Sequence, residues 1–324
     1  MANFEELAEK LSMTELIRLQ DVLSKAIVRR FEKRLALVFA DVVGSTPYFA
    51  RFGDEAGRKL QQRLYDQVNH AITPEGGRVV DTAGDGVFLC FDSVAAAARA
   101  MVALQRNIVR DNDSRAPDHR LHVRIGVHAG PVLTDGKQVT GDAVNFCSRV
   151  AGSAAPGEIR LSINAHGELT DVEMRLRSRR QRGVELKGVA APQDLFTLDW
   201  LDASKFPSLV RFADGNEVRL PTLDVIRFGR LREQDGVVAN DVVIALSDPN
   251  LQSRISRWHF ELHRRADGFF LRAVSTSTTE IDGKAVTRGE DVLLKPGSKV
   301  TLGGALTLEF RAEDFSGENT LLPG

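Results

Sequence analysis

The chain has 324 residues, of which 43% are hydrophobic and 27% are charged, a composition typical of globular proteins and long enough for two domains. Its 43 basic and 44 acidic residues give a net charge of -1. The chain as a whole therefore has no excess positive charge that would attract nucleic acid or an anionic membrane. Cys90 and Cys147 lie in apolar stretches outside any C-x-x-C pattern, which favours a reducing compartment, the cytoplasm. An acidic N-terminus and short apolar runs predict neither secretion nor a membrane span.

Residues 1–34 predict a short N-terminal helical segment. Helical periodicity covers residues 3–34, and Ser12 with Glu15 makes a capping-box pattern. The apolar stripe of this segment consists of Leu16, Leu19, Leu23, Ile27 and Phe31. Such a stripe has to be buried, either against its own domain or against a second copy of the chain.

Residues 35–200 predict an α/β domain in which helices cover a mainly antiparallel sheet. The expected elements, in chain order, are a strand at 35–40, a long helix from Ser45, a hairpin of strands 78–81 and 87–91, a helix from Ser93, a strand at 123–129, a helix at 142–152 and a strand at 158–161.

Residues 208–312 predict an all-β sandwich after a linker at 201–207, because short apolar runs alternate with Gly, Asp and Pro turns. The expected strands are 209–212, 217–220, 225–228, 242–244, 260–263, 269–273 and 301–310. Residues 313–324 are expected to be a flexible tail.

Two carboxylates follow neighbouring strands of the predicted sheet. Asp41 ends the strand at 35–40, and Asp85 lies in the turn Gly84-Asp85-Gly86 of the hairpin. At one edge of a sheet, this pair could hold two Mg²⁺ or Mn²⁺ ions against a triphosphate. Asp-Gly is also a common hairpin turn, so Asp85 alone is a weak signal.

Further polar residues favour a phosphate ligand. Gly44, Ser45 and Thr46 open a helix, whose free N–H groups and positive dipole end suit phosphate oxygens. Asn145 and Arg149 lie four residues apart, so they share one helix face and can contact the same ligand. Arginine brings a permanent charge and a planar donor fork to a phosphoryl group, and asparagine can orient a ribose.

Over residues 34–200 these motifs resemble the class III nucleotidyl cyclases, the adenylate and guanylate cyclase family. The resemblance rests on Phe39-Ala40-Asp41, Gly84-Asp85-Gly86 and Val144-Asn145-x-x-Ser148-Arg149. It implies a ferredoxin-like domain and two metal ions per site, and attack of the ribose 3′-oxygen on the α-phosphorus with loss of pyrophosphate. It also implies that Lys187 contacts the terminal phosphates.

The same resemblance implies a homodimer with its sites at the interface. Asp41 and Asp85 of one chain would face Asn145 and Arg149 of the other, so a monomer would be inactive.

Two positions differ from typical adenylate cyclases, which carry lysine where this chain has Asp81 and aspartate or threonine where it has Gln138. An acidic Asp81 resembles the guanylate cyclases, since a carboxylate accepts from guanine N1–H while Gln138 donates to O6. Gln138 also fits adenine and Asp81 also fits uracil, so ATP, GTP and a pyrimidine triphosphate stay open. The structural alternative for Asp81 is an exposed residue beside a hairpin turn.

In the C-terminal part, Arg230, Ser256 and Arg257 offer forked donors and a hydroxyl to a phosphate. Over residues 207–312, Gly-Arg followed by Ser-x-x-His resembles the forkhead-associated (FHA) domain, which implies binding of Thr-phosphorylated proteins, with His259 in a structural role. Ser277-Thr278 replace the Asn-Gly that the family often has, which puts the grip on the peptide backbone in question.

Two hypotheses follow for the whole chain. The first is an active cyclase whose output or location is set by docking to a Thr-phosphorylated protein. The second is a catalytically degenerate cyclase fold that serves as a dimeric scaffold, with phosphothreonine-dependent binding as its sole activity. A further hypothesis is that Thr320, once phosphorylated, occupies the C-terminal domain of its own or a neighbouring chain.

Overall fold

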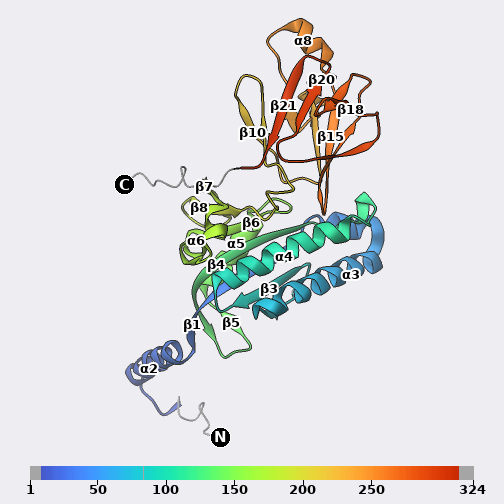
Figure 1. The fold of residues 1–324 in the computed structure, drawn as a ribbon. Helices are drawn as coiled ribbons and strands as arrows, with labels where there is room; N and C mark the ends of the chain where they lie inside the picture. Colours follow the sequence, from blue (N-terminus) through green and yellow to red (C-terminus); the bar gives the residue numbers. More distant parts are fainter. Residues whose placement is uncertain (1–8, 83, 314–324) are drawn as a thin grey trace.

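The structure is a computed structural model that describes residues 9–82 and 84–313. Figure 1 shows an α/β domain, a β domain stacked above it, and one helix that projects from the lower end. Thr320 and most of the expected tail lie outside the described residues. Among the residues that are described, no helix has the length and apolar content that crossing a membrane requires.

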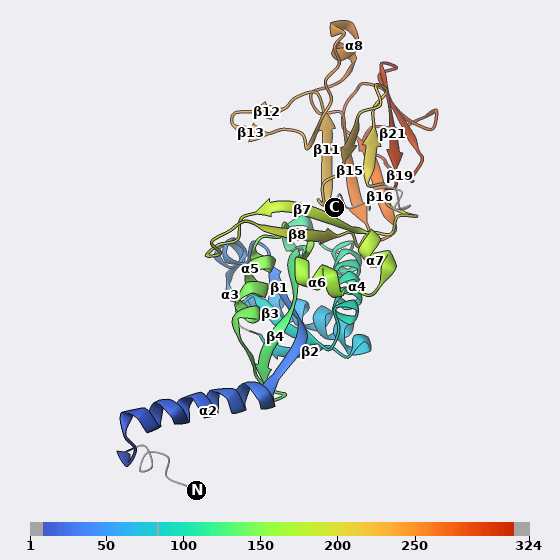
Figure 2. The same ribbon diagram turned by 90° about the vertical axis from the view of Figure 1, so that its left-hand side faces the viewer.

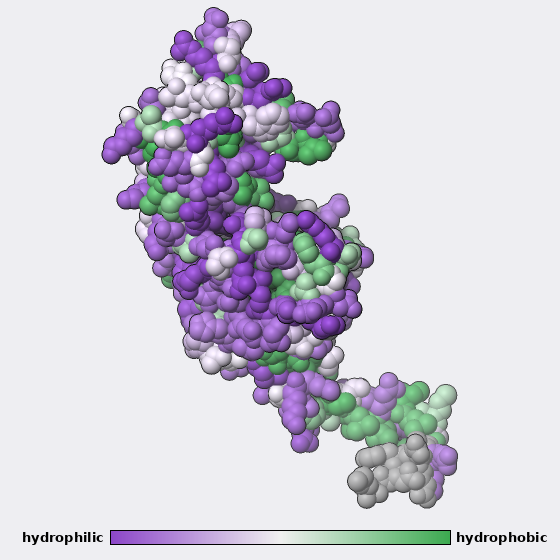
Figure 3. Space-filling model, turned by 90° about the vertical axis from the view of Figure 1, so that its right-hand side faces the viewer, coloured by the Kyte–Doolittle hydropathy of each residue, from purple (hydrophilic) through white to green (hydrophobic). Residues whose placement is uncertain are grey.

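The projecting helix is α2 (Met13–Phe31), which is shorter than the predicted helix. Its start is fixed at Ser12, whose backbone N–H donates to Glu15 Oε2 over 2.9 Å. The apolar stripe does not pack on its own domain, since Leu23 and Ile27 are 53% and 46% exposed. Figures 2 and 3 show the helix extending away from the domain with hydrophobic residues on its surface.

An eight-stranded sheet, mainly antiparallel as predicted, forms the α/β domain. Its order is β2-β3-β1-β4-β6-β8-β7, with β5 paired to β4 and β4–β6 the parallel pair. The strands are β1 (Glu32–Val42), β2 (Arg78–Asp81), β3 (Gly86–Phe91), β4 (Val123–Thr134), β5 (Val139–Thr140), β6 (Ile159–Ser162), β7 (Ser178–Val184) and β8 (Gln193–Leu198). β1 begins at Glu32, before the predicted start at residue 35.

Helices cover both faces of this sheet. One face packs on α3 (Ser45–Ile72) and α4 (Val94–Asn112), and the other packs on α5 (Asp142–Gly152). The remaining helices are α6 (Ile163–Glu168), α7 (Val172–Leu176), η1 (Thr73–Glu75) and η2 (Pro117–His119).

Alternation along β1 decides which face each side chain reaches. Ala36, Val38 and Ala40 belong to the core that contains α3 and α4, whereas Leu35 and Leu37 belong to the core beneath α5. Asp41 has the parity of Leu37, so it lies on the α5 face.

The C-terminal domain is an all-β sandwich whose core is built around Phe228, Phe260 and Phe310. One sheet has the order β10-β9-β21-β20-β17-β18, and the other has the order β14-β11-β15-β16-β19. The strands are β9 (Leu209–Arg211), β10 (Glu217–Arg219), β11 (Val225–Gly229), β14 (Val242–Val243), β15 (Phe260–Arg265), β16 (Gly268–Ala273), β17 (Thr279–Ile281), β18 (Lys284–Ala285), β19 (Asp291–Leu294), β20 (Lys299–Leu302) and β21 (Leu306–Arg311). A separate pair, β12 (Glu233–Gln234) and β13 (Val237–Val238), and one short helix, α8 (Pro249–Arg254), complete the domain.

The prediction of a single strand at 301–310 is wrong, because β20 and β21 form an antiparallel hairpin there. Gly303 and Gly304 have φ values of 56° and 63°, a left-handed conformation that glycine adopts without strain and that ends β20.

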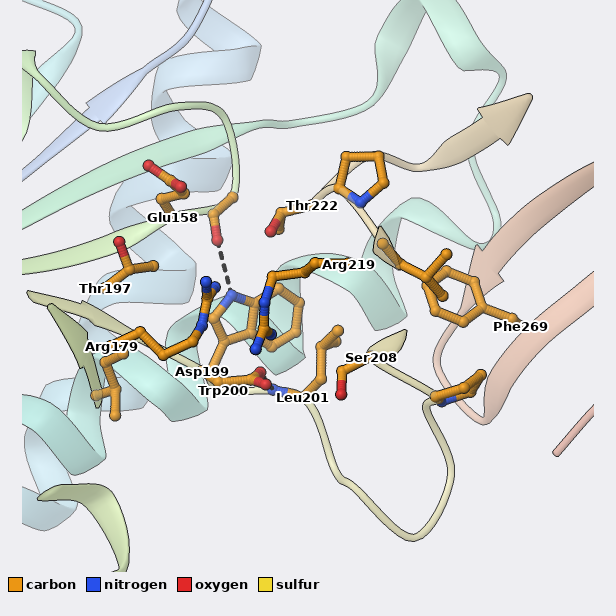
Figure 4. A pocket seen from close by; sticks show the side chains of 15 residues that line it. Glu158, Arg179, Thr197, Asp199, Trp200, Leu201, Ser208, Arg219, Thr222 and Phe269 are labelled. Carbon is orange, nitrogen blue, oxygen red and sulfur yellow. Dashed lines mark hydrogen bonds between the residues drawn. The ribbon is translucent and has the colours of Figure 1, made fainter. Parts of the chain in front are cut away.

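The segment expected to be a linker is packed between the domains. Phe206 is 6% exposed, and its ring meets Phe269 edge-on at 5.4 Å. Just before the segment, Trp200 Nε1 donates to the Gly157 carbonyl over 2.7 Å. Figure 4 shows Trp200 and Phe269 among the side chains that line a small cavity to which both domains contribute. The two domains therefore meet through a packed junction rather than a free tether.

Candidate active site and phosphopeptide site

Asp41 lies near the end of β1, between β3 and β4. Its register partners are Gly86 on β3 and Arg124 on β4. Arg124 donates to Asp41 Oδ2 through Nη2 at 2.8 Å and through Nε at 3.3 Å. Asp41 and Arg124 side chains are 32% and 35% exposed, so this ion pair remains accessible to a ligand.

Asp85 reaches the same place from the turn between β2 and β3. Its backbone carbonyl accepts from Val42 N–H over 3.2 Å, and its Oδ2 accepts from the Ser45 hydroxyl. The turn is held from α3, because Gln61 Nε2 donates to the Gly84 carbonyl over 2.9 Å. The structure therefore brings Asp41, Asp85 and Ser45 together, the convergence that the sequence predicted.

Gly86 leaves room for the Asp41 carboxylate. A Cβ built on Gly86 would lie 2.5 Å from Asp41 Oδ1, well inside van der Waals contact. A side chain at this position would displace the carboxylate, so the close approach of the two strands depends on glycine.

The start of α3 faces the two carboxylates. Gly44 precedes the helix with φ 74°, and its carbonyl accepts from Tyr48 N–H over 3.1 Å. Ser45 is 8% exposed, whereas Thr46 is exposed. The first N–H groups of a helix have no intrahelical partner, so this end provides donors beside Asp41 and Asp85.

Asn145 and Arg149 are both exposed on α5. Arg149 Nη1 donates to the Gly188 carbonyl over 2.7 Å, and this contact brings the segment that carries Lys187 next to the helix. Buried Leu186 anchors that segment in a cluster with Val150 of α5. Asn145, Arg149 and Lys187 therefore form a second group, for which no contact with the two carboxylates exists among the described residues of one chain.

The two base-recognition candidates lie on segments that touch each other. Asp81 is exposed at the end of β2, where a bulge makes it the register partner of Phe88. Gln138 is exposed in the turn between β4 and β5. Arg78 Nη1, on the strand of Asp81, donates to the Lys137 carbonyl over 3.0 Å and links the two segments.

In the β domain, the loops of Arg230 and Ser256 pair directly. Arg230 N–H donates to the Ser256 carbonyl over 3.0 Å, and Arg257 lies next along the chain with its side chain exposed. His259 is fully buried, and its Nδ1 accepts from Ser256 N–H over 3.1 Å, which agrees with the structural role that the resemblance implies.

One residue near these loops, Asn240, was missed in the sequence. Buried Asn240 donates through Nδ2 to the carbonyls of Leu231 and Arg257, at 2.7 and 2.8 Å, and so fixes both loops. The Ser256 hydroxyl lies 2.9 Å from Oγ of Ser277, so the segment at 277–278 lies beside the proposed phosphate site. Arg124 was missed as well, because strand register is not readable from the sequence.

Comparisons with known proteins cover both domains. The family described as "Adenylate and Guanylate cyclase catalytic domain" matches residues 28–199, which is more than half of the chain, and the family described as "FHA domain" matches residues 226–303. A "Putative adenylate cyclase 3" of Rhizobium meliloti is 28% identical over 144 residues, which cover 44% of this chain and 24% of that protein.

An "Adenylate cyclase" of Streptomyces coelicolor is 31% identical over 137 residues, which cover 42% of this chain and 34% of that protein. The chain thus spans about a quarter to a third of the length of these two relatives. A crystal structure titled "Adenylate/Guanylate Cyclase/Hydrolase from Silicibacter pomeroyi" aligns with a TM-score of 0.46 and 25% identity, over 52% of this chain and 96% of that one. The chain belongs to the adenylate and guanylate cyclase family, and an FHA domain follows its catalytic domain.

Proposed function

We propose that this chain converts a nucleoside triphosphate, ATP or GTP, into the 3′,5′-cyclic nucleotide and pyrophosphate, and that its FHA domain binds Thr-phosphorylated proteins. One observation carries the catalytic part: Asp41, Asp85 and Ser45 converge at the start of α3. Arg124 offsets the charge of Asp41. No ion pair among the described residues offsets the charge of Asp85, whose carboxylate accepts only the Ser45 hydroxyl, so this point leaves a place for a bound cation.

The residues fit a pair of Mg²⁺ or Mn²⁺ ions. Within the described residues, protein hydrogen bonds to the two carboxylate groups reach Oδ2 in each case, which leaves Oδ1 of Asp41 and of Asp85 for a ligand. No cluster of three or more metal-ligating side chains occurs in the described part of the chain. Such a sparse set suits hard cations that take most of their remaining ligands from water and phosphate. When bound, the ions would supply Lewis acidity at the reacting phosphate.

The chain's own residues then have separate tasks. The backbone N–H groups of Ser45 and Thr46 and the Thr46 hydroxyl bind phosphate oxygens, the Ser45 hydroxyl holds Asp85, and Gly44 shapes the turn. Arg149 and Lys187 stabilise the charge that develops as the ribose 3′-oxygen attacks the α-phosphorus and pyrophosphate leaves. Asn145 orients the ribose, and Asp81 and Gln138 contact the base.

We place the complete site at a homodimer interface. Asp41 lies on the α5 face of the sheet, and Asn145 and Arg149 are exposed on α5 itself, so two chains docked by this face can exchange their half-sites. The stripe on α2 supports a second copy as the partner, because no residue of this helix is buried by the part of the chain that the structure describes.

The decisive assay incubates the purified protein with Mn²⁺ and ATP, GTP, CTP or UTP in turn, and identifies cyclic products by mass. Asp85→Ala should abolish product, whereas Asp92→Ala, an exposed aspartate at the other end of β3, should not. If no triphosphate is cyclised, the scaffold hypothesis replaces the enzyme.

Mixing inactive variants tests the interface. Asp85→Ala and Arg149→Ala proteins each lack one half-site, but a mixed dimer contains one intact site. The mixture should regain about a quarter of wild-type activity if the sites are shared between chains. Failure to regain activity after subunit exchange would contradict the shared site.

Phosphothreonine binding is tested separately by titrating matched phosphorylated and unphosphorylated threonine peptides. Arg230→Ala and Ser256→Ala should weaken binding of the phosphorylated peptide. Arg227→Ala, on the same strand but paired with Asp241, is the control that should retain it. Equal affinity for both peptides would rule out phosphate recognition.

A further inference from the structure

The loop between α4 and β4, residues 113–122, is called here the junction loop. It lies between the FHA domain and the segment of residues 41–48, which carries Asp41 and the start of α3 and is called here the catalytic segment. Its base is fixed by Asn112, which is 5% exposed. The Asn112 amide donates to the Leu121 carbonyl and accepts from Leu121 N–H, both over 2.8 Å. The loop is therefore anchored at its base, and its two sides are held by different parts of the chain.

The FHA domain holds one side of the junction loop through Asp224, the residue before β11. Asp224 Oδ2 accepts from Arg120 Nη1 at 3.4 Å and lies 3.7 Å from His122 Nε2. Its other oxygen accepts from Arg264 Nη2 at 2.8 Å, and Arg264 is buried with its guanidinium 5.4 Å from the Trp200 ring. One carboxylate thus joins a buried FHA arginine to two residues of the junction loop.

The charge on Asp224 is stabilised at this place. Burial alone would raise the pKa of Asp224, but the charge and hydrogen bond of Arg264, with the nearby charges of His122 and Arg120, outweigh burial and lower it. The carboxylate therefore stays ionised at neutral pH and keeps its attraction for the junction loop.

The catalytic segment holds the other side of the junction loop. The His122 carbonyl accepts from Val43 N–H over 2.8 Å, and Val43 is two residues beyond Asp41. His119 Nδ1 lies 2.9 Å from the hydroxyl of Tyr48, in the first turn of α3. The side chains of His119 and His122 therefore contact different partners, Tyr48 and Asp224.

From these contacts we propose that Asp224 is a positioning residue for the cyclase reaction. It reaches from the FHA domain to the junction loop and, through the loop, holds Val43 and the start of α3 in the geometry that aligns Asp41 and Ser45. The FHA domain thus completes the support of the metal site as well as offering a binding surface. This proposal rests on the proposed cyclase activity, because its first readout is the rate of cyclisation.

The kinetic test uses the full-length chain and compares Asp224→Asn with Asp291→Asn. Asp291 is a close match, since it is 17% exposed like Asp224 and also binds two arginines, Arg265 and Arg272, but entirely within the FHA domain. Asp224→Asn should lower kcat about tenfold and raise the Mn²⁺ concentration for half-maximal rate, because small displacements at a reacting centre are costly. Asp291→Asn should change neither quantity.

A second variant protects the test against misfolding of the FHA domain. Arg120→Gln removes the junction contact from the cyclase side and leaves the Asp224–Arg264 pair intact. It should have the same effect as Asp224→Asn, and the double variant should be no slower than either, because both changes remove one shared interaction. Wild-type kcat and Mn²⁺ dependence in both single variants would overturn the proposal, as would an equal loss in Asp291→Asn.

Hydrogen exchange gives a readout that does not depend on activity. Amides of residues 41–48 should exchange faster in Asp224→Asn than in wild type, including Val43, whose N–H donates to the junction loop. They should be unchanged in Asp291→Asn. If the wild type forms no cyclic nucleotide but the Asp224→Asn variant exchanges faster at residues 41–48, the proposed cyclase activity is wrong and the positioning role of Asp224 is retained. If exchange at these residues is unchanged in Asp224→Asn, the positioning role itself is wrong.

Discussion

Replacing Gly86 with alanine tests how closely the proposed metal site depends on its geometry. The added Cβ would lie 2.5 Å from Asp41 Oδ1, whereas ordinary contacts begin at 3.4 Å, so the carboxylate has to move by about 0.9 Å. A displacement of this size at a reacting centre can cost about 100-fold in rate. We therefore expect kcat of Gly86→Ala to fall about 100-fold.

The assay measures initial rates at saturating triphosphate over a range of Mn²⁺ concentrations, with the midpoint of thermal unfolding recorded in parallel. The matched control is Gly167→Ala in α6, where an added Cβ meets nothing within 4 Å and the backbone is helical. The control should keep wild-type kcat and the wild-type midpoint or a slightly higher one. If Gly86→Ala retains wild-type kcat, the argument that this glycine sets the position of Asp41 is refuted.

Three further predictions concern buried groups. Burial lowers the pKa of His128 to about 4, so its contribution to stability is fully present above pH 6.5 and is lost as the pH falls toward 4. The free energy of unfolding measured in urea should be about 2 kcal/mol lower at pH 5 than at pH 7, and His128→Gln should remove most of that difference. Trp200→Phe leaves the buried Gly157 carbonyl without its donor, so the free energy of unfolding should fall by about 1–3 kcal/mol in the same measurement, and an unchanged value would show that this hydrogen bond does not support the junction. Burial raises the pKa of both thiols, so Cys90 and Cys147 should not react with a disulfide reagent at pH 7 until the chain unfolds, and rapid labelling of the native protein would contradict their burial.

The parts of the site that the sequence predicted rest on local patterns. Asp41 follows a continuous apolar strand, and Asp85 lies in a turn only a few residues from the next strand. Their meeting also needs β1 to pair with β3, which sets Asp41 opposite Gly86, but each carboxylate was placed from its own local sequence. Asn145 and Arg149 were predictable for the same reason, since their spacing within one helix fixes their relation.

The parts that were not predicted depend on pairing between distant segments. Arg124 reaches Asp41 because of the register between β1 and β4, which the local sequence does not encode. The early start of β1 was hidden because Glu32 and its neighbours are charged and exposed, and they pair with the far end of β4 without being buried. Periodicity detects burial, so a strand that extends beyond its covering helices leaves no signal.

The packed junction has a consequence for how the two domains work together. An FHA domain on a flexible tether could change where the enzyme is located, but binding of a ligand to it would not change the conformation of the active site through the linker. Here Phe206 is buried within the expected linker and Trp200 is buried just before it. Strand β11 runs directly from the junction, after Asp224, to Gly229, next to Arg230 in the proposed phosphate-binding loop. Strand β11 therefore connects the two proposed sites, and on these proposals a ligand that orders the loop at Arg230 would also affect Asp224, the carboxylate proposed to support the segment of Asp41.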